Sequence, residues 1–324
     1  DKENVIITEK EGKLLFFNLK NKNFGEIKHN LSLISLGQGG LLDVYVEKRD
    51  SDIHVFLCFS KASEELFHST VILEKSILVD DKLENKEIVF TTKKPHKEAL
   101  HFGCRIAVSD KYVYLSLGER GNRNNSQNIN NYEGSIVRVK FENNMIKKNP
   151  FNNDWLNEVY SIGHRNPQGL IIDKMTNKIW SHEHGPQGGD EINLIEAGGN
   201  YGWPKATHGE EYGGGKIGEI SIDGFIDPKW VWTPSIAPSG MALYNGNMFP
   251  ELNNHLLIGA LRAQNIYAVK IDDEILISEK KILQDVYGRI RDIEVMDDGS
   301  IIFLTDEEKN GIYKGGLYKI YKPE

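Results

Sequence analysis

Short segments in which apolar and polar residues alternate recur along this 324-residue chain, and each is followed by a polar turn and a second such segment. Alternation with a period of two is typical of β-strands, whereas the 3.6-residue period of helices is scarce here. The strand–turn–strand pattern occurs six times, in repeats that begin at Asn4, Gly40, Gly103, Gly169, Gly240 and Arg291. The pattern therefore predicts an all-β protein made of six similar units.

The spacing of these repeats predicts how they are arranged. Six units in 324 residues average about 54 residues each, slightly more than the ~40–50 of a propeller blade. One unit cannot bury both faces of its small sheet, but six units arranged radially can. A β-sandwich, or a pair of them, is the main alternative, yet it does not predict the same pattern six times. We predict a six-bladed β-propeller that forms a single domain over residues 1–324.

Two stretches lack the repeat pattern and hold the excess length. Residues 142–162 form a polar linker, and residues 185–218 contain 11 of the 31 glycines. Long loops inside compact domains are usually functional or disordered. Tyr201, Trp203 and Tyr212 favour order, so we predict that residues 185–218 form a glycine-rich functional loop outside the core.

Charge and cysteine content narrow the possible functions. The formal net charge of −8 argues against a protein that binds nucleic acid through a basic face. No apolar stretch approaches the ~20 residues that span a bilayer. Cys58 and Cys104 lie in predicted strands, where two buried thiols and a disulfide are both possible. The start of the numbering at Asp1 is compatible with earlier removal of a targeting peptide.

Polar side chains stand where the chain enters the first strand of several repeats. They are Gln38, His101, Arg165, Asn166, Arg289 and Arg291. Because equivalent positions of successive blades lie at the same end of a propeller, we expect these side chains to converge on one site. His101 is the candidate general base, since the ordinary pKa of histidine is ~6.5. Glu119, which ends the following strand, can accept a hydrogen bond from the second ring nitrogen and orient the base.

Arginines dominate this set in an otherwise acidic protein. The predicted cationic cluster contains Arg165, Arg289, Arg291 and, from the segment IGALRAQ, Arg262. Guanidinium groups suit bidentate recognition of carboxylates or phosphates, so a small polyanion is the expected partner. The alternative is that each arginine pairs with a local carboxylate such as Asp292 or Glu294.

The end of the fourth repeat offers two kinds of metal site. His182 and His184 share one face of a strand and, with His164, can bind a transition metal. Oxygen ligands suit calcium better, and they come from the carbonyls of Gly185 and Pro186 and the carboxylates of Asp190 and Glu191. A third interpretation is that the two carboxylates are solvated turn residues.

Two long motifs resemble the soluble pyrroloquinoline quinone (PQQ)-dependent glucose/sorbosone dehydrogenases, and in particular their bacterial aldose sugar dehydrogenase branch. They are GHRNPQGL at residues 163–170 and EHGPQGGDEINLIEAGGNYGWP at residues 183–204. Shorter segments of the same family follow in the same order: LGQGGLLDV, HFGCRI, SGMALYNG, LLIGALR and GRIRDI. The resemblance covers nearly the whole chain and also implies a six-bladed propeller.

The resemblance implies a chemistry and assigns residues to it. His101, with Glu119 and Arg165 in the catalytic set, would remove the proton of the anomeric hydroxyl while a hydride passes to PQQ. The implied PQQ-binding residues are Gln38, Arg165, Asn166, Tyr212, Ala260, Leu261, Arg262, Arg289, Ile290 and Arg291. The carbonyls of Gly185 and Pro186 would bind a Ca²⁺ ion beside PQQ. Glu191 and Tyr201 would bind a second, structural Ca²⁺ ion.

The resemblance also implies partners and a location. The substrate would be an aldose sugar, an external acceptor would take the electrons, and the protein would be periplasmic or secreted, as a monomer or weak dimer. The chain departs from the family in a shortened first blade and in Glu119, where relatives can carry aspartate. Two other functions stay open: a non-catalytic propeller that binds a partner, and a calcium-dependent propeller hydrolase such as a lactonase.

Overall fold

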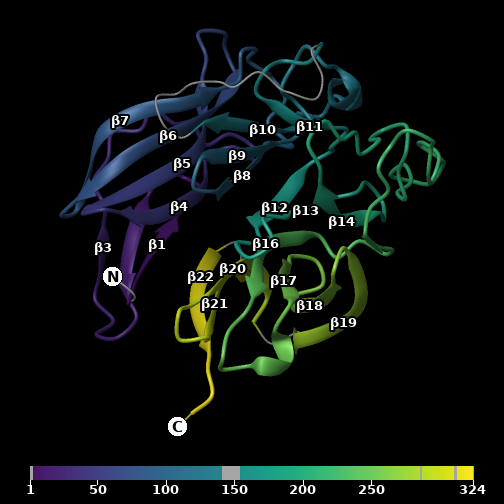
Figure 1. Cartoon of the computed structure of the whole chain (residues 1–324). Coiled ribbons are helices and arrows are strands. Elements are labelled where there is room, and N and C mark those ends of the chain that lie inside the picture. Colours follow the sequence, from purple (N-terminus) through teal and green to yellow (C-terminus); the bar gives the residue numbers. More distant parts are fainter. Residues whose placement is uncertain (1–2, 141–153, 285–286, 310–311, 324) are drawn as a thin grey trace. The chain divides into compact units, whose positions relative to one another are not determined.

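The computed structural model describes residues 3–140, 154–284, 287–309 and 312–323, and these residues are almost entirely β-structure (Figure 1). Six antiparallel sheets of three or four strands follow one another along the chain. Within each sheet the strands are neighbours in sequence order, which is the up-and-down meander of a propeller blade. The predicted six-bladed β-propeller is confirmed.

The strands of the first three sheets are β1 (Asn4–Thr8), β2 (Leu14–Asn18) and β3 (Phe24–Glu26); β4 (Leu41–Arg49), β5 (Asp52–Ala62), β6 (Ser69–Val79) and β7 (Lys82–Thr91); and β8 (Gly103–Val108), β9 (Tyr112–Leu117), β10 (Ser135–Lys140) and β11 (Val159–Ile162). Those of the other three are β12 (Pro167–Ile172), β13 (Ile179–Glu183), β14 (Asp190–Ile195) and β15 (Trp230–Trp232); β16 (Pro238–Tyr244), β17 (His255–Ala260), β18 (Asn265–Asp272) and β19 (Ile275–Gln284); and β20 (Arg289–Val295), β21 (Ile301–Lys309) and β22 (Ile312–Ile320). Two short 3₁₀ helices span Arg123–Gln127 and Pro250–Leu252.

Each predicted repeat corresponds to the first two strands of one sheet. The repeat that begins at Gly40, for example, forms β4 and β5, and the one that begins at Arg291 forms β20 and β21. Alternating residues therefore indicated the hairpin that starts every blade. The third and fourth strands were not part of the predicted repeat.

The chain divides into two compact units. The first comprises residues 1–167 and 196–204, and the second comprises residues 168–195 and 205–324. The first unit contains β1–β11, and the second contains β12–β22, apart from the first residue of β12. The single domain over residues 1–324 stays a prediction.

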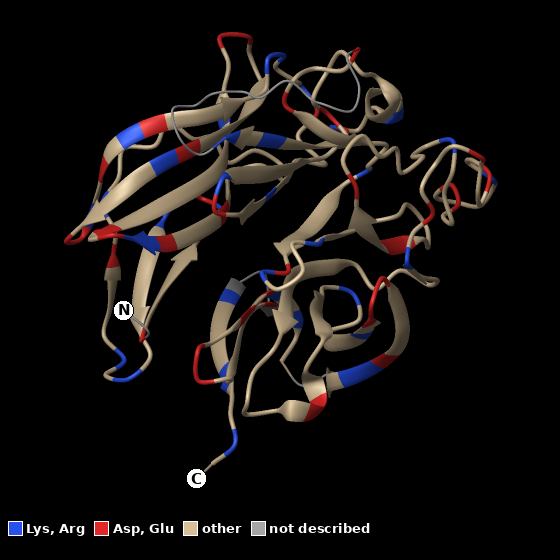
Figure 2. Ribbon diagram, viewed as in Figure 1, with Lys and Arg blue, Asp and Glu red and all other residues tan. Residues whose placement is uncertain are grey.

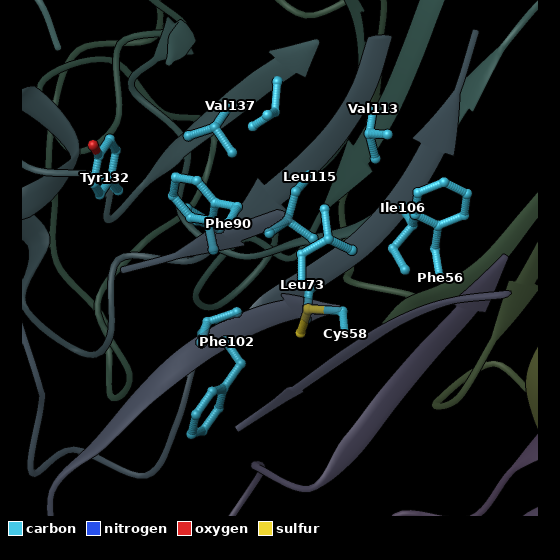
Figure 3. Close-up of a cluster of buried hydrophobic side chains, with 14 of the residues drawn as sticks. Phe56, Cys58, Leu73, Phe90, Phe102, Ile106, Val113, Leu115, Tyr132 and Val137 are labelled. Atoms are coloured by element: carbon cyan, nitrogen blue, oxygen red, sulfur yellow. A yellow bond between two sulfur atoms is a disulfide. The ribbon is translucent and has the colours of Figure 1, made fainter. Parts of the chain in front are cut away.

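The first unit is organised around a cluster of buried apolar side chains between β4–β7 and β8–β11. Phe56, Leu73, Phe90 and Leu115 belong to this cluster, and Figure 3 shows Leu73 beside Cys58. Cys58 on β5 forms a disulfide with Cys104 on β8, and their Cα atoms are 5.8 Å apart, within the usual range for this bond. Of the two states that the sequence left open, the cysteines adopt the disulfide.

The second unit has two apolar clusters. One joins the fourth and fifth sheets through Trp180, Ile192, Leu256 and Val269. The other joins the fifth and sixth sheets, where Tyr244, wholly buried, donates its hydroxyl to the carbonyl of Gly299 at 2.8 Å.

Two boundaries drawn from the sequence are wrong. The predicted loop at 185–218 contains β14, a central strand whose Ile192 is fully buried. The predicted linker at 142–162 ends in β11, and its residues 142–153 lie outside the described residues. In both cases short strands flanked by glycines or asparagines carry too few alternating residues to reveal themselves.

Charged residues of both signs are interspersed on the sheets, as along β6 and β7 in Figure 2. There Lys75 and Glu87 form an ion pair at 2.7 Å. Among the described residues, no helix has the length and apolar character needed to cross a membrane.

Candidate active site

The pair His101–Glu119 stands at the start of the third sheet, in the first unit. His101 precedes β8 and Glu119 follows β9, and these two strands pair with Gly103 opposite Leu117. Nδ1 of His101 lies 2.7 Å from Oε1 of Glu119, and the Glu119 side chain is only 2% exposed. A carboxylate accepts here, so Nδ1 carries the proton and Nε2 is left as the basic nitrogen. The predicted contact is present, and its catalytic role stays a prediction.

The backbone holds His101 in an uncommon conformation. Its φ angle is +50°, in the left-handed region that non-glycine residues seldom adopt. The His101 amide donates to Oε1 of Gln38 at 2.7 Å, and the Gln38 amide donates to the carbonyl of Ala99 at 2.7 Å. A Cβ atom on Gly118 would lie 2.2 Å from the His101 carbonyl oxygen, so only glycine fits there. Gln38 and Gly118 thus fix the backbone from which the imidazole projects.

Arg165 and Asn166 lie beside this pair, in the strand entrance of the next repeat. The carbonyl of Arg165 accepts from the Glu119 amide at 2.9 Å, and Oδ1 of Asn166 accepts from the Gly103 amide at 3.3 Å. The Arg165 guanidinium lies 5.4 Å from the ring centre of Trp203, a cation–π contact. The first unit therefore brings together five of the predicted site residues: Gln38, His101, Glu119, Arg165 and Asn166.

Two details of this site were missed by sequence reasoning. Trp203 was assigned only to an ordered loop, although it supports the Arg165 guanidinium. Oε2 of Glu119 is buried without a hydrogen-bond partner among the described residues. No sequence signal marks either feature, because both depend on which side chains the fold packs together.

The second unit contains the other predicted arginines, and Arg289 and Arg291 share one carboxylate. Arg291 donates from Nε to Oδ2 of Asp306 at 2.7 Å, and also from Nη2. Nε of Arg289 lies 3.7 Å from Oδ1 of the same carboxylate. The side chains of Arg289 and Arg291 are 43% and 45% exposed. One carboxylate between two guanidinium groups leaves a net positive charge facing solvent, which fits an anionic ligand.

The remaining residues of the predicted cofactor set lie in β17, in the turn after it, in β20 and in the loop around Tyr212. Arg262 is exposed in the turn after β17, and the amides of Leu261 and Arg262 donate to the carbonyls of Ala237 and Ile236. Ala260 ends β17 and is buried, and the carbonyl of buried Ile290 accepts from Ser239 Oγ at 2.6 Å. Tyr212 is 72% exposed beside three glycines with positive φ.

Asp190 anchors the loop that carries the predicted carbonyl ligands Gly185 and Pro186. Its carboxylate accepts from the amides of Gly185 at 2.9 Å and Ala237 at 2.8 Å, and from Ser235 Oγ at 3.0 Å. Asp190 is only 1% exposed, so its interpretation as a solvated turn residue is wrong. Its three hydrogen bonds instead fix the turn from which the two carbonyl groups project.

Glu191 faces another carboxylate that the sequence did not single out. It pairs across β13 and β14 with Glu183, which is 3% exposed. Nδ2 of Asn193 donates to Oε1 of Glu191 at 2.9 Å and approaches Oε1 of Glu183 at 3.4 Å. Burial, reinforced by the charge of Glu183, raises the pKa of Glu191 to about 8. A buried and a half-buried carboxylate side by side are an unfavourable arrangement that a cation would relieve.

The histidines of the fourth repeat do not form the predicted alternative, a transition-metal site, among the described residues. Within the described ranges, no group of three or more His, Cys, Asp or Glu side chains is placed to hold a metal ion. Nε2 of His164 lies 2.9 Å from Ser161 Oγ, and Nε2 of His184 lies 2.6 Å from the Pro238 carbonyl, so the transition-metal interpretation gains no support. The Tyr201 hydroxyl accepts from the Glu196 amide at 2.8 Å.

Comparison with known proteins gives matches along the whole chain. A family model described as Glucose / Sorbosone dehydrogenase matches residues 1–314. Aldose sugar dehydrogenase YliI of Escherichia coli is 35% identical over 288 residues, covering 86% of this chain and 77% of that protein. A solved glucose dehydrogenase has a TM-score of 0.91 at 31% identity, covering 100% and 94% of the two chains. The PQQ-bound aldose sugar dehydrogenase of Streptomyces coelicolor has a TM-score of 0.78 at 25% identity, covering 97% and 90%.

Proposed function

This chain belongs to the glucose/sorbosone dehydrogenase family, as predicted, and from that premise we propose that it is a PQQ- and calcium-dependent aldose sugar dehydrogenase that oxidises its substrate at C1 to a lactone. The observation that carries the proposal is the His101–Glu119 pair. A histidine with one nitrogen fixed by a buried carboxylate and the other nitrogen free of that bond is suited to accept a proton.

The residues of the chain supply the proton chemistry. Nε2 of His101 takes the proton of the C1 hydroxyl, and Glu119 stabilises the resulting imidazolium and keeps the ring oriented. PQQ, when bound, would supply a hydride acceptor, and Ca²⁺ would supply Lewis-acid chemistry. The sugar thus loses a proton and a hydride, which converts the C1 alcohol into a lactone carbonyl.

The donor set of the chain fits a tricarboxylated cofactor. Arg289 and Arg291 expose nearly half of their side chains and share a single carboxylate, so they retain positive charge for a ligand. Arg165 offers a third guanidinium, stacked on Trp203. We assign these arginines, with Arg262, to the carboxylates of PQQ. Gln38, Asn166 and Tyr212 complete the proposed set.

Calcium fits the oxygen donors of the second unit. The turn fixed by Asp190 would present the carbonyls of Gly185 and Pro186 to one ion. Glu191 would bind a second ion. The raised pKa of Glu191 supports this assignment, because a carboxylate that is hard to ionise without a counter-charge becomes a good partner for a divalent cation.

The disulfide supports a periplasmic or secreted location, because such bonds persist in oxidising compartments. The proposed partners are an aldose sugar and a separate electron acceptor, and the proposed assembly is a monomer or weak dimer.

A titration of PQQ into the purified protein, with and without Ca²⁺, tests the proposal. Saturable binding by absorbance, followed by dye reduction on addition of glucose or another aldose, is the expected result. PQQ binding without turnover across an aldose panel would indicate a non-catalytic propeller. Lactone hydrolysis that needs Ca²⁺ but not PQQ would indicate a hydrolase, and either result would end the proposal.

A further inference from the structure

Arg120, which directly follows Glu119, forms hydrogen bonds with the segment that carries His101. Its Nε donates to the carbonyl of Leu100 at 3.2 Å, and its Nη2 donates to the carbonyl of Glu98 at 2.5 Å. Its backbone amide donates to the carbonyl of His101 at 3.3 Å. Arg120 therefore binds the carbonyls of two residues that precede the predicted base and the carbonyl of the base itself.

Two further contacts complete the surroundings of the Arg120 side chain. The guanidinium carbon lies 3.8 Å from the centre of the Phe102 ring, and Nη2 also donates to Oγ of Ser69 at 3.1 Å. Ser69 begins β6 in the neighbouring sheet, so Arg120 ties the 98–102 segment to a second blade of the same unit. Arg120 itself is only 2% exposed.

Burial of a guanidinium is unfavourable unless its hydrogen bonds are satisfied. Burial lowers the pKa of Arg120 to about 10, and the nearby carboxylates of Glu133, Glu98 and Glu119 act in the opposite direction. An apolar residue of similar volume would avoid this desolvation, but it could not bind the two carbonyl groups. The contacts made by Arg120 are therefore directed at the backbone conformation of the 98–102 segment.

We propose that Arg120 is a positioning residue for the oxidation: it clamps the 98–102 segment so that the His101 ring stays hydrogen-bonded to Glu119. His101 has a left-handed φ of +50°, a conformation that persists only where surrounding contacts enforce it. Gln38 provides one such contact at the His101 amide, and Arg120 provides those at the Glu98, Leu100 and His101 carbonyls. The role assigned to Arg120 rests on the proposed role of His101 as the base.

Arg120→Lys is the decisive variant, because lysine keeps the charge but cannot reach two carbonyl groups with a planar fork. We expect kcat to fall about 10- to 100-fold at saturating sugar, with PQQ affinity and the sugar KM within about threefold of the parent. The acidic limb of the pH–kcat profile should move to lower pH, since a loosened Glu119 contact stabilises the imidazolium less. An arginine that matters only for stability would lower the melting temperature without moving this limb.

Arg138→Lys is the matched control. Arg138 lies on β10 of the same sheet and stacks on Tyr112 and Tyr160, and it has no contact with the 98–102 segment among those described for that segment. The same chemical change there should leave kcat and the pH limb unaltered. Equal losses in both variants, or an unmoved limb in Arg120→Lys, would overturn the role of Arg120.

A measurement without turnover separates this role from the proposed function. The titration of the His101 ring, followed by NMR in the cofactor-free protein, should shift to lower pH in Arg120→Lys because a loosened Glu119 contact stabilises the imidazolium less. Should Arg120→Lys not fold, Ser69→Ala removes one guanidinium partner and is expected to shift the titration in the same direction by a smaller amount. An unchanged His101 titration rejects the clamp, whereas full activity in a His101 variant rejects the base and leaves the clamp testable.

Discussion

The two units of the chain differ in how far their functional charged side chains are exposed to solvent. In the first unit His101, Glu119 and Arg120 are largely buried, and each is held by specific backbone groups. In the second unit Arg289 and Arg291 share one carboxylate and keep nearly half of their side chains exposed. Buried and fully oriented groups are what bond-making requires, whereas exposed guanidinium groups can reorganise around an incoming anion.

The buried groups and the exposed arginines therefore have different roles in the proposed reaction. Changes at His101, Glu119 and Arg120 in the first unit should alter the rate of the chemical step, and changes at Arg289 and Arg291 in the second unit should alter the affinity for the cofactor.

The largest effect is expected for His101→Gln. Glutamine keeps a polar side chain of similar size but cannot accept the proton, so kcat should fall about 10²- to 10⁴-fold. PQQ affinity, measured by equilibrium titration of absorbance, should change by less than about threefold. A weakened affinity with unchanged kcat would place His101 in the cofactor-binding set and break the division between the units.

The second largest effect is expected when the disulfide is removed, and it concerns the free energy of unfolding rather than turnover. Cys58→Ser with Cys104→Ser opens a link between residues 46 apart in the sequence, and removal of such a link destabilises a fold by about 2–4 kcal/mol. Urea unfolding followed by fluorescence should show this loss. Because Cys104 lies three residues after His101, a loss of kcat that accompanies it would indicate that the disulfide also helps to hold the base.

Arg291→Ala should weaken PQQ binding. Loss of a charge-assisted hydrogen bond of about 1.5–3 kcal/mol corresponds to a Kd about 10- to 100-fold higher, with kcat at saturating PQQ nearly unchanged. Asp306→Asn is an informative companion, because it removes the carboxylate that both arginines share. Stronger PQQ binding in that variant is expected, and no change in either variant would contradict the assignment of an anion to this strand.

The smallest effect concerns Glu191 and pH. Its pKa is raised from 4.5 in the unfolded chain to about 8 in the folded protein, so the folded state binds the proton more tightly. The contribution of Glu191 to the free energy of unfolding is complete below pH 4.5 and is lost as the pH rises toward 8. In chelator-treated protein we expect a loss of about 1 kcal/mol between pH 6 and pH 7, measured by urea unfolding.

Two comparisons sharpen the pH experiment. Glu191→Gln should remove most of the dependence, because glutamine does not titrate. Ca²⁺ should reduce the dependence in the parent protein if Glu191 binds the ion. A pH dependence that is unaltered in Glu191→Gln would assign it to another group.

The parts of the site predicted best are those made within one hairpin. His101 and Glu119 flank β8 and β9, and an antiparallel hairpin necessarily brings the residue before its first strand near the residue after its second. The alternative in which each arginine pairs with a local carboxylate named Asp292 and Glu294 as examples, but Arg291 pairs with Asp306, which lies on the next strand of the same blade. A register shift between Ile290 and Asp292 changes which side chains are neighbours there, and no sequence pattern indicates it.

Alternating residues along the chain were enough to determine the six hairpins, because alternation depends on near neighbours and on burial of one face of a strand. Only the tertiary structure decided the Cys58–Cys104 bond, the support of Arg165 by Trp203, the Glu183–Glu191 pair and the clamp formed by Arg120. Each joins side chains from different strands or loops. Which of them meet depends on strand register and on how neighbouring sheets pack, information that no single segment of the sequence contains.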